Sequence, residues 1–398
     1  MVAYRTYRFG GGLPARRWGA LRYLLLTLSP EGAIGVADLG TKETIDAAVG
    51  RLLAALTRPD TDPVRPAREL DRLVMAKVRP LVGARRRLWL SLDGELQLVP
   101  FAALHDGQGY LVDRYELGYL SSGRDLLRPE SAESARRGPT EAVLLVDPAF
   151  GAPPALAAAQ LGGSRRERGL LPASIPPLPG TRAEAEAIRK LVPTARVLSG
   201  AEATEPALLG LVAPDILHVA THGVFLADPA APAGGARGLH LVSTAVGAPA
   251  AKNPLVRSAL LLAGAGAPAL RASEAPDGPD GVATALEVAG MNLWGTELVV
   301  LSACDSGRGA VRLGQGVYGL RRAVLVAGAE TLVTSLWRVD DEVTEKLMTR
   351  FYEGLLSGRG RLESMGLAAR AIRLGHPHPY YWAPFVVMGR TDPLRPAR

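Results

Sequence analysis

Two residues that could carry out nucleophilic chemistry each follow an apolar run of the chain. Cys304, the only cysteine, comes after Leu298–Ala303, and His222 comes directly after Ile216–Thr221. Continuous apolar runs bounded by turn residues are typical of parallel strands that are buried on both faces. Because functional groups gather at the carboxyl ends of such strands, we expect both side chains at one sheet edge if the two strands are neighbours.

A histidine beside a cysteine would make the thiol reactive. A lone cysteine in an apolar run is more often a small buried hydrophobe, so the catalytic interpretation of Cys304 depends on His222. A nearby imidazole lowers the pKa of a thiol by pairing with the thiolate, and it can then protonate a leaving amine and activate water. The N–H groups of Gly223 and Cys304 are candidate donors to an oxyanion. Without a Cβ, Gly223 is expected to allow a sharp turn after the histidine.

Hydrophobic periodicity and turn residues predict the elements that must position this pair. In the first part of the chain we expect a β-hairpin, two helices and two strands, at Leu21–Leu28 with Ala33–Leu39, Thr41–Leu56, Leu70–Leu81, Leu88–Leu92 and Tyr115–Leu120. The rest of the chain predicts alternating strands and helices. The strands are Ala142–Val146, Ala195–Leu198, Ile216–Thr221, Ser258–Leu262, Leu298–Ala303, Thr331–Ser335 and Phe385–Met388; the helices are Arg182–Leu191, Glu205–Leu211, Thr284–Met291, Gln315–Ala327, Asp341–Leu356 and Leu362–Leu374.

This alternation predicts an α/β fold, with a mostly parallel central sheet in a three-layer α/β/α sandwich. We expect a smaller α/β subdomain at residues 1–138, the larger α/β domain at 139–390 and a C-terminal tail at 391–398. The charged and polar stretch Ser122–Thr140 is expected to link the two halves.

Composition narrows the classes of partner. The net charge of +7 and the pI of about 9.7 could indicate nucleic-acid binding. However, only five of the 46 basic residues are lysine, and the arginines are spread along the chain, so no nucleic-acid partner is expected. A single cysteine excludes an intramolecular disulfide and fits a reducing compartment, and no apolar run approaches the ~20 residues that cross a bilayer. We therefore expect a cytoplasmic protein without membrane insertion.

Two segments resemble the signature sequences of a known family. His-Val-Ala-Thr-His-Gly (218–223) and Leu-Ser-Ala-Cys-Asp-Ser-Gly (301–307) are similar to those of CHAT-domain peptidases, which are caspase- and separase-like cysteine proteases. The resemblance extends over about residues 88–389, at Val99–Leu104, Pro177–Glu186, Gly314–Arg322, Ser335–Thr344 and His378–Val386. It implies a caspase-like fold with His222 as the general base and Cys304 as the nucleophile. It also implies that residues 1–138 form a degenerate caspase-like subdomain.

Four further residues are candidates for substrate binding. Asp305 follows the nucleophile, at the position where caspases carry an arginine and cut after Asp. An acidic residue there would favour a basic side chain before the scissile bond; the alternative is that Asp305 caps its loop. Asp340 and Asp341 are alternative pocket residues, although Asp341 could equally be a helix N-cap. Trp337 could form a wall of the cleft or be an ordinary packed aromatic.

Other motifs give weaker signals. His218 and His222 form H-x-x-x-H, but the segment predicts a strand, on which the two side chains would lie about 13 Å apart, so no metal site is expected. The glycines Gly314, Gly316 and Gly319 match G-x-G-x-x-G, but a loop separates them from the preceding strand, so no dinucleotide cofactor is expected.

Together these observations predict a cysteine endopeptidase that cleaves a protein substrate through a thioester and needs no cofactor. A catalytically silent caspase-like scaffold that binds partners and a small-molecule amidase are the alternatives. Helical repeats, which are common upstream in relatives, are absent from this sequence. We therefore expect control by a separately encoded protein activator or regulator, in bacterial defence or cell death as for relatives.

Overall fold

The computed structural model describes most of the chain. The described residues are 1–7, 18–127, 141–151, 175–225, 255, 258–266, 279–302, 304–305, 315–338 and 340–396, without the side chains of residues 3, 5–7, 225, 304–305 and 315–318. Most of the expected linker, residues 128–140, lies outside this set. The chain forms two compact units, the first from Met1–Arg128 and Arg359–Asp392, the second from Pro129–Gly358 and Pro393–Arg398.

This division differs from the expected domain boundaries at the C-terminal end. Residues 359–390 were assigned to the larger domain, whereas the structure groups them with the first unit. Within the first unit, β15 (Phe385–Gly389) lies parallel to β5 (Glu116–Leu120), with Met388 opposite Tyr119. The assignment of the two parts as degenerate and catalytic caspase-like domains stays a prediction.

The first unit combines an antiparallel sheet with three parallel strands. The expected hairpin is confirmed as β2 (Trp18–Leu28) and β3 (Ile34–Thr41), with β1 (Val2–Tyr7) pairing antiparallel to β2. The parallel strands are ordered β4-β5-β15, where β4 is Arg87–Ser91. The helices are α1 (Lys42–Leu56), α2 (Val64–Leu73), α3 (Met75–Val82), α9 (Arg361–Gly375) and α10 (Pro379–Trp382), with 3-10 turns η2 to η5 at Gly94–Leu98, Phe101–Ala103, Leu111–Asp113 and Gly123–Leu127. The hydroxyl of Thr41 caps α1 by accepting a hydrogen bond from the N–H of Thr44.

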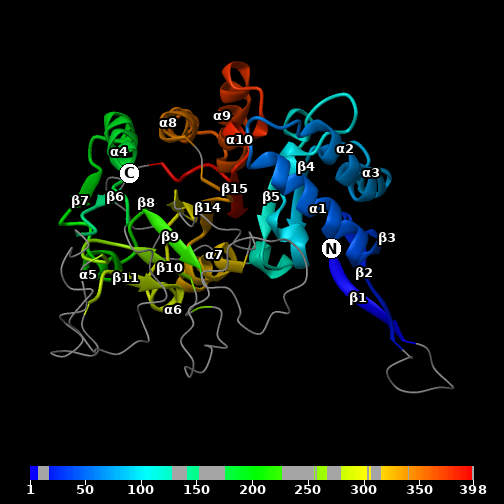
Figure 1. The fold of residues 1–398 in the computed structure, drawn as a ribbon, viewed down its shortest axis with the longest axis horizontal. Coiled ribbons are helices and arrows are strands. Elements are labelled where there is room, and N and C mark those ends of the chain that lie inside the picture. Colours follow the sequence, from blue (N-terminus) through cyan, green and yellow to red (C-terminus); the bar gives the residue numbers. More distant parts are fainter. Residues whose placement is uncertain are drawn as a thin grey trace. The chain divides into compact units, whose positions relative to one another are not determined.

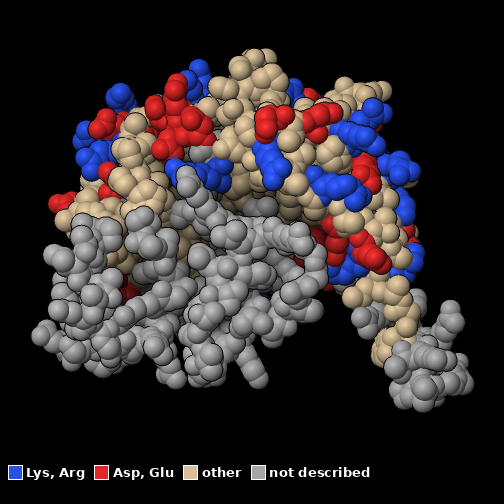
Figure 2. All heavy atoms as spheres, in the orientation of Figure 1, with Lys and Arg blue, Asp and Glu red and all other residues tan. Residues whose placement is uncertain are grey.

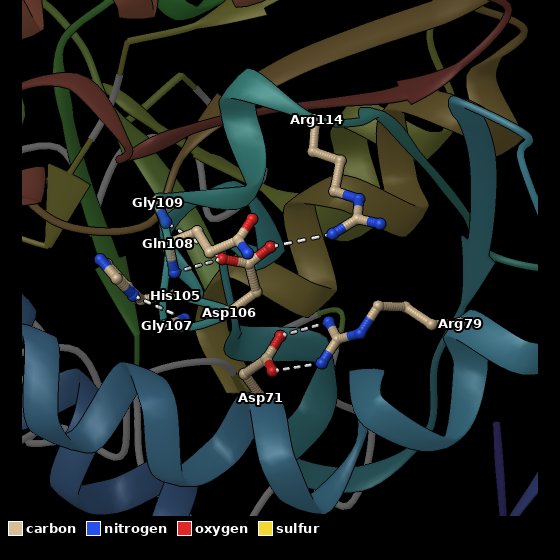
Figure 3. A network of polar contacts seen from close by, with 8 residues as sticks. All are labelled: Asp71, Arg79, His105, Asp106, Gly107, Gln108, Gly109 and Arg114. Atoms are coloured by element: carbon tan, nitrogen blue, oxygen red, sulfur yellow. Dashed lines mark hydrogen bonds and ion pairs between the residues drawn. The ribbon is translucent and has the colours of Figure 1, made fainter.

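The helix predicted over Leu70–Leu81 is wrong in its bounds, because the chain forms two helices, α2 and α3, that are separated at Val74. Figure 3 shows a contact between these two helices: Arg79 of α3 donates two hydrogen bonds, of 2.9 and 2.6 Å, to the buried carboxylate of Asp71 on α2. In the same view, Asp106 accepts bonds from the N–H groups of Gln108 and Gly109 and pairs with Arg114. These carboxylates therefore fix local turns of the first unit.

The second unit contains the parallel sheet on which the candidate pair depends. Its strands are ordered β14-β12-β8-β6-β7, and every neighbouring pair is parallel. Their bounds are β6 Ala142–Pro148, β7 Arg196–Gly200, β8 Ile216–Ala220, β12 Leu298–Leu301 and β14 Thr331–Ser335. All residues of β8, β12 and β14 are buried, as expected for a sheet covered on both faces. The predicted α/β fold with a mostly parallel sheet is confirmed.

Helices cover both faces of these strands. In Figure 1, α4 (Pro179–Leu191) and α8 (Asp341–Leu356) lie on one side, and α6 (Ala285–Ala289) and α7 (Gln315–Ala327) lie on the other; α5 is Glu205–Leu209. The helices α4 and α8 pack against each other. The outer face of α8 is charged, and acidic side chains gather over it in Figure 2, beside the ion pairs Lys346–Glu342 and Arg350–Glu353.

A second, smaller sheet was not predicted from the sequence. It is ordered β11-β10-β9-β13, with bounds β9 His222–Phe225, β10 Ser258–Leu261, β11 Val282–Thr284 and β13 Cys304–Asp305. Strand β10 pairs antiparallel with both β9 and β11, so the strand predicted at Ser258–Leu262 does not belong to the parallel sheet. No helix in the described part of the chain is both long and apolar enough to cross a membrane.

Candidate active site

The strands that precede the histidine and the cysteine are neighbours in the parallel sheet. In the register of β8 and β12, Val219 lies opposite Leu301. Their carboxyl ends therefore meet at one sheet edge, which is the condition for bringing His222 and Cys304 together. The condition on which the sequence analysis depended, that the two strands are neighbours, is met.

Beyond this edge, the backbone keeps the two residues side by side. After β8 and β12 the chain enters β9 and β13, which pair in parallel, with Cys304 opposite His222 and Asp305 opposite Gly223. Because paired strands lie about 4.8 Å apart, the backbones of the cysteine and the histidine are immediate neighbours. The side chains of Cys304 and Asp305 are outside the described atoms.

Gly223 lies inside a strand and does not form the expected sharp turn. It pairs with Asp305 on one side and with Leu260 of β10 on the other, so the chain continues in extended form after His222. The prediction of a turn at this glycine is wrong, because the small sheet extends beyond the edge of the large one. Its role as an oxyanion donor stays a prediction.

The imidazole of His222 is held by a backbone carbonyl. The side chain is only 2% exposed, and its Nε2 lies 2.7 Å from the carbonyl oxygen of Pro176. A carbonyl oxygen can only accept a hydrogen bond, so Nε2 carries the hydrogen in the neutral ring. This tautomer leaves Nδ1 as the nitrogen that can take up a proton, which is what a general base requires.

Burial and nearby charges set the protonation of His222. Its pKa is lowered, first by burial and also by the positive charge of Arg338, whereas the contact with Pro176 and the charge of Asp341 oppose this shift. Burial disfavours the charged form of an imidazole. A lowered pKa means that His222 is neutral, and able to act as a base, at neutral pH.

An apolar cluster accounts for the burial of the imidazole. The ring of Phe150 lies 5.2 Å from the ring of His222, measured between centroids. Phe150 packs with buried residues from the segment before α4 and from β10, and partly buried side chains extend this cluster. Its members are Phe150, Leu178, Leu261 and Ala265, with Ile175, Val224 and Val282 packed against them. The cluster keeps water from one side of the histidine.

Asp147, near the end of β6, makes polar contacts that hold the segment containing Pro176. This aspartate has a positive φ of 42°, a conformation that costs a non-glycine residue free energy. One carboxylate oxygen accepts a hydrogen bond of 3.2 Å from the N–H of Leu178, and the other pairs with Arg182 at 2.9 Å. The N–H of Asp147 donates to the hydroxyl of Thr181. These contacts fix the position of the carbonyl that binds His222.

The first turns of α4 and α8 meet without space for another atom. A Cβ placed on Gly180 of α4 would lie 2.3 Å from the Cβ of Asp341 on α8, which is closer than two carbon atoms can approach. Only glycine fits at this position. The contact places Asp341 near the segment that binds His222, in agreement with the effect of its charge on the histidine.

The structure also places the other predicted site residues. The carboxylate of Asp340 caps α8 by accepting hydrogen bonds from the N–H groups of Glu342 and Val343, so Asp340, not Asp341, is the N-cap. Asp341 is half-buried, and burial raises its pKa. Trp337 is 5% exposed and therefore packed. Substrate binding by these residues stays a prediction.

Sequence reasoning missed the residues that surround the histidine. Pro176, Arg338 and Asp147 were not singled out, because a carbonyl contact, an electrostatic effect and an unusual φ have no signal in a single sequence. The nearest signals were the stretches Pro177–Glu186 and Ser335–Thr344, of which the second contains Arg338, and both were identified only through the family resemblance.

Comparisons with known proteins found one family model and several proteins that are similar to this chain. The family model described as the CHAT domain matches residues 64–390. Tetratricopeptide repeat protein 28 of Homo sapiens is 26% identical over 324 residues, which are 77% of this chain and 12% of that protein, and the Mus musculus protein of the same name matches equally. The chain thus spans only a small part of the length of these curated relatives.

Two solved structures of proteases are similar over most of the chain. The Saccharomyces cerevisiae separase–securin complex matches with a TM-score of 0.40 and 10% identity, over 91% of this chain and 20% of that one. The Arg-specific cysteine proteinase gingipain R matches with a TM-score of 0.41 and 9% identity, over 89% of this chain and 75% of that one. The family model, which covers most of the sequence, decides the assignment: the chain belongs to the CHAT domain family.

Proposed function

We propose that this protein is a cysteine endopeptidase in which His222 and Cys304 form the catalytic dyad. The observation that carries the proposal is the register of β9 and β13, in which these two residues are opposite each other. Membership of the CHAT domain family adds support. The buried, neutral imidazole, with its Nε2 hydrogen directed to Pro176, adds a base of suitable protonation state.

The proposed reaction begins with transfer of the thiol proton of Cys304 to Nδ1 of His222. The thiolate attacks the peptide carbonyl carbon, and the carbonyl oxygen becomes an oxyanion that accepts hydrogen bonds from backbone N–H groups, with those of Gly223 and Cys304 as candidates. The carbon–nitrogen bond then breaks as the imidazolium gives its proton to the leaving amine, and a thioester remains. Water, deprotonated by the imidazole, attacks the thioester and releases the acid and the thiol.

Asp305 is the residue that we propose for substrate selection. It immediately follows the nucleophile and its backbone lies opposite Gly223, so it is next to the reacting bond in this proposal. Its negative charge would favour lysine or arginine before the scissile bond by charge-assisted hydrogen bonding.

The test compares wild type with Cys304→Ala and His222→Ala on a library of peptides. We expect each substitution to reduce hydrolysis at least about hundred-fold while the fold is kept, with a lower melting temperature for His222→Ala because its buried side chain is lost. His105→Ala, a histidine substitution in the first unit, serves as the matched control and is expected to keep full activity. Full activity in either dyad variant would contradict the proposal.

A second measurement separates the protease from a silent scaffold. In a protease, a peptide chloromethyl ketone should label Cys304 much faster than it labels a simple exposed thiol, and the label should be absent in Cys304→Ala. A scaffold would react no faster than the simple thiol. An amidase would hydrolyse small amides and leave peptides intact.

A further inference from the structure

His218, Glu184 and Tyr352 are three buried polar side chains that the proposed reaction does not use. His218 is the third residue of β8 and is fully buried. Its Nδ1 lies 3.1 Å from the hydroxyl oxygen of Tyr352 on α8, and its Nε2 lies 3.2 Å from a carboxylate oxygen of Glu184 on α4. Glu184 is 2% exposed and Tyr352 is 0% exposed. One histidine thus contacts both helices that cover this face of the sheet.

The donors and acceptors of the three groups can be matched. Burial and the charge of Glu184 raise the pKa of Tyr352, so its hydroxyl keeps its proton and can donate it to Nδ1. The hydrogen of the ring is then on Nε2, the nitrogen that lies nearer the carboxylate of Glu184. This second contact is close but not aligned as a linear hydrogen bond, so its attraction is mainly electrostatic. A buried carboxylate without such a partner would be costly.

These contacts join β8, α4 and α8, and the same three elements position the groups around His222. Strand β8 leads directly into His222. Glu184 lies one helical turn after Gly180, which touches Asp341, and α4 follows the segment whose Pro176 carbonyl binds the imidazole. Tyr352 lies on α8, which begins at Asp341. A displacement of α4 or α8 relative to β8 would therefore move the groups that hold and polarise the histidine.

We propose that Glu184, His218 and Tyr352 are positioning residues that hold α4 and α8 on β8 so that the carbonyl of Pro176 reaches Nε2 of His222. The proposed reaction assigns no chemical step to any of the three. This inference rests on the proposed function, in which His222 is the general base. The effect of the three residues on the imidazole of His222 can nevertheless be measured without any substrate.

The test uses Tyr352→Phe and Glu184→Gln, which remove a hydroxyl or a charge without changing side-chain size. Tyr119→Phe is the matched control, since Tyr119 is a buried tyrosine of the first unit that accepts a bond from Phe101 and donates one to the carbonyl of Val99. All three variants are expected to lose thermal stability, so stability alone does not distinguish them. Because Tyr352→Phe removes no charge, it remains informative if Glu184→Gln fails to fold.

The first readout is the imidazole of His222, followed by NMR across a pH titration and assigned with His222→Gln. In Tyr352→Phe and Glu184→Gln we expect the population with hydrogen on Nε2 to fall and the pKa to change, whereas Tyr119→Phe should match wild type. An unchanged His222 tautomer and titration in both test variants would overturn the proposal, whether or not the protein proves to be a protease.

The second readout consists of two rates. One is the rate at which iodoacetamide alkylates Cys304, and the other is the rate at which the enzyme hydrolyses a peptide substrate. Displacement of a catalytic base by a fraction of an ångström is expected to lower kcat by about ten-fold or more with little change in KM. Wild-type Cys304 that reacts only as a simple exposed thiol would contradict the protease, and the NMR titration would still decide the role of the three residues. A fall in kcat that is equal in Tyr119→Phe would count against positioning.

Discussion

Cys304 lies opposite His222 in the register of two short parallel strands, β13 and β9, although the two residues are far apart in the sequence. Strands β8 and β12 of the parallel sheet bring the chain to the sheet edge, and the small sheet then carries both residues beyond it. The proposed dyad is therefore held by backbone pairing, which depends little on the identity of neighbouring side chains.

The charges beside His222 predict shifts of its titration in opposite directions. Arg338 lowers the pKa of the histidine and Asp341 raises it. Arg338→Gln should therefore raise this pKa, so that the base is lost at a higher pH as the solution is acidified. Asp341→Asn should lower the pKa and keep the base neutral to a lower pH. The acid limb of kcat/KM against pH measures both effects, and shifts of the same sign in both variants would contradict the electrostatic explanation.

The contact between α4 and α8 predicts a steric effect at Gly180. An added methyl group would overlap Asp341, so Gly180→Ala should destabilise the fold by about 1–3 kcal/mol, as is typical of overpacking. The control is Gly50→Ala, in the middle of α1, where a Cβ would meet no atom within 4 Å. That change should stabilise the protein by about 0.4–1 kcal/mol. Urea unfolding measures the free energy of unfolding of both variants. Similar free energies for the two would contradict the prediction and show that α4 and α8 can move apart at little cost.

The proposed role of Asp305 predicts a defined cleavage preference. A peptide library should be cut mainly after arginine or lysine, and Asp305→Asn should reduce kcat/KM for these sites by about ten-fold or more, because a charge-assisted hydrogen bond is weakened. Sequencing the cleaved peptides gives the preference. If Asp305 only caps its loop, the variant would lose stability and keep the wild-type preference.

Control by a protein partner predicts low activity in the isolated chain. We propose this control as an extension of the protease function, and we expect the purified protein to cut casein slowly or not at all until the partner is added. The measurement is a time course of casein cleavage, with Cys304→Ala as the blank. Rapid cleavage by the purified chain alone would exclude dependence on a partner.

Much of the parallel sheet could be predicted because its strands are buried on both faces. Runs such as Ile216–Ala220 and Leu298–Leu301 contain few polar residues, and their turn residues mark the ends. The family resemblance and the strand ends together selected His222 and Cys304. The sequence could not predict β9 and β13, since both are short and neither is a continuous apolar run.

The contacts around the candidate site required the three-dimensional structure. Asp147 and Glu184 bind partners that are distant in sequence, and neither residue type nor spacing indicates such a pair. The break at Val74 was missed for a similar reason, because the apolar pattern continues through it, and the Asp71–Arg79 contact across the break joins residues of two different helices. Local signals were therefore reliable for buried strands and poor for polar contacts between elements.

The pairing of β13 with β9 also limits how this part of the gene can change in length. One residue inserted or deleted between β12 and β13 would bring a neighbour of Cys304 opposite His222, and side chains on a strand alternate between faces. Substitutions between the two strands leave this alignment intact, whereas a change of a single codon in length would misalign it. The number of residues between Leu301 and Cys304 therefore sets the alignment of Cys304 with His222. We expect this number to be under stronger constraint than the identity of the residues.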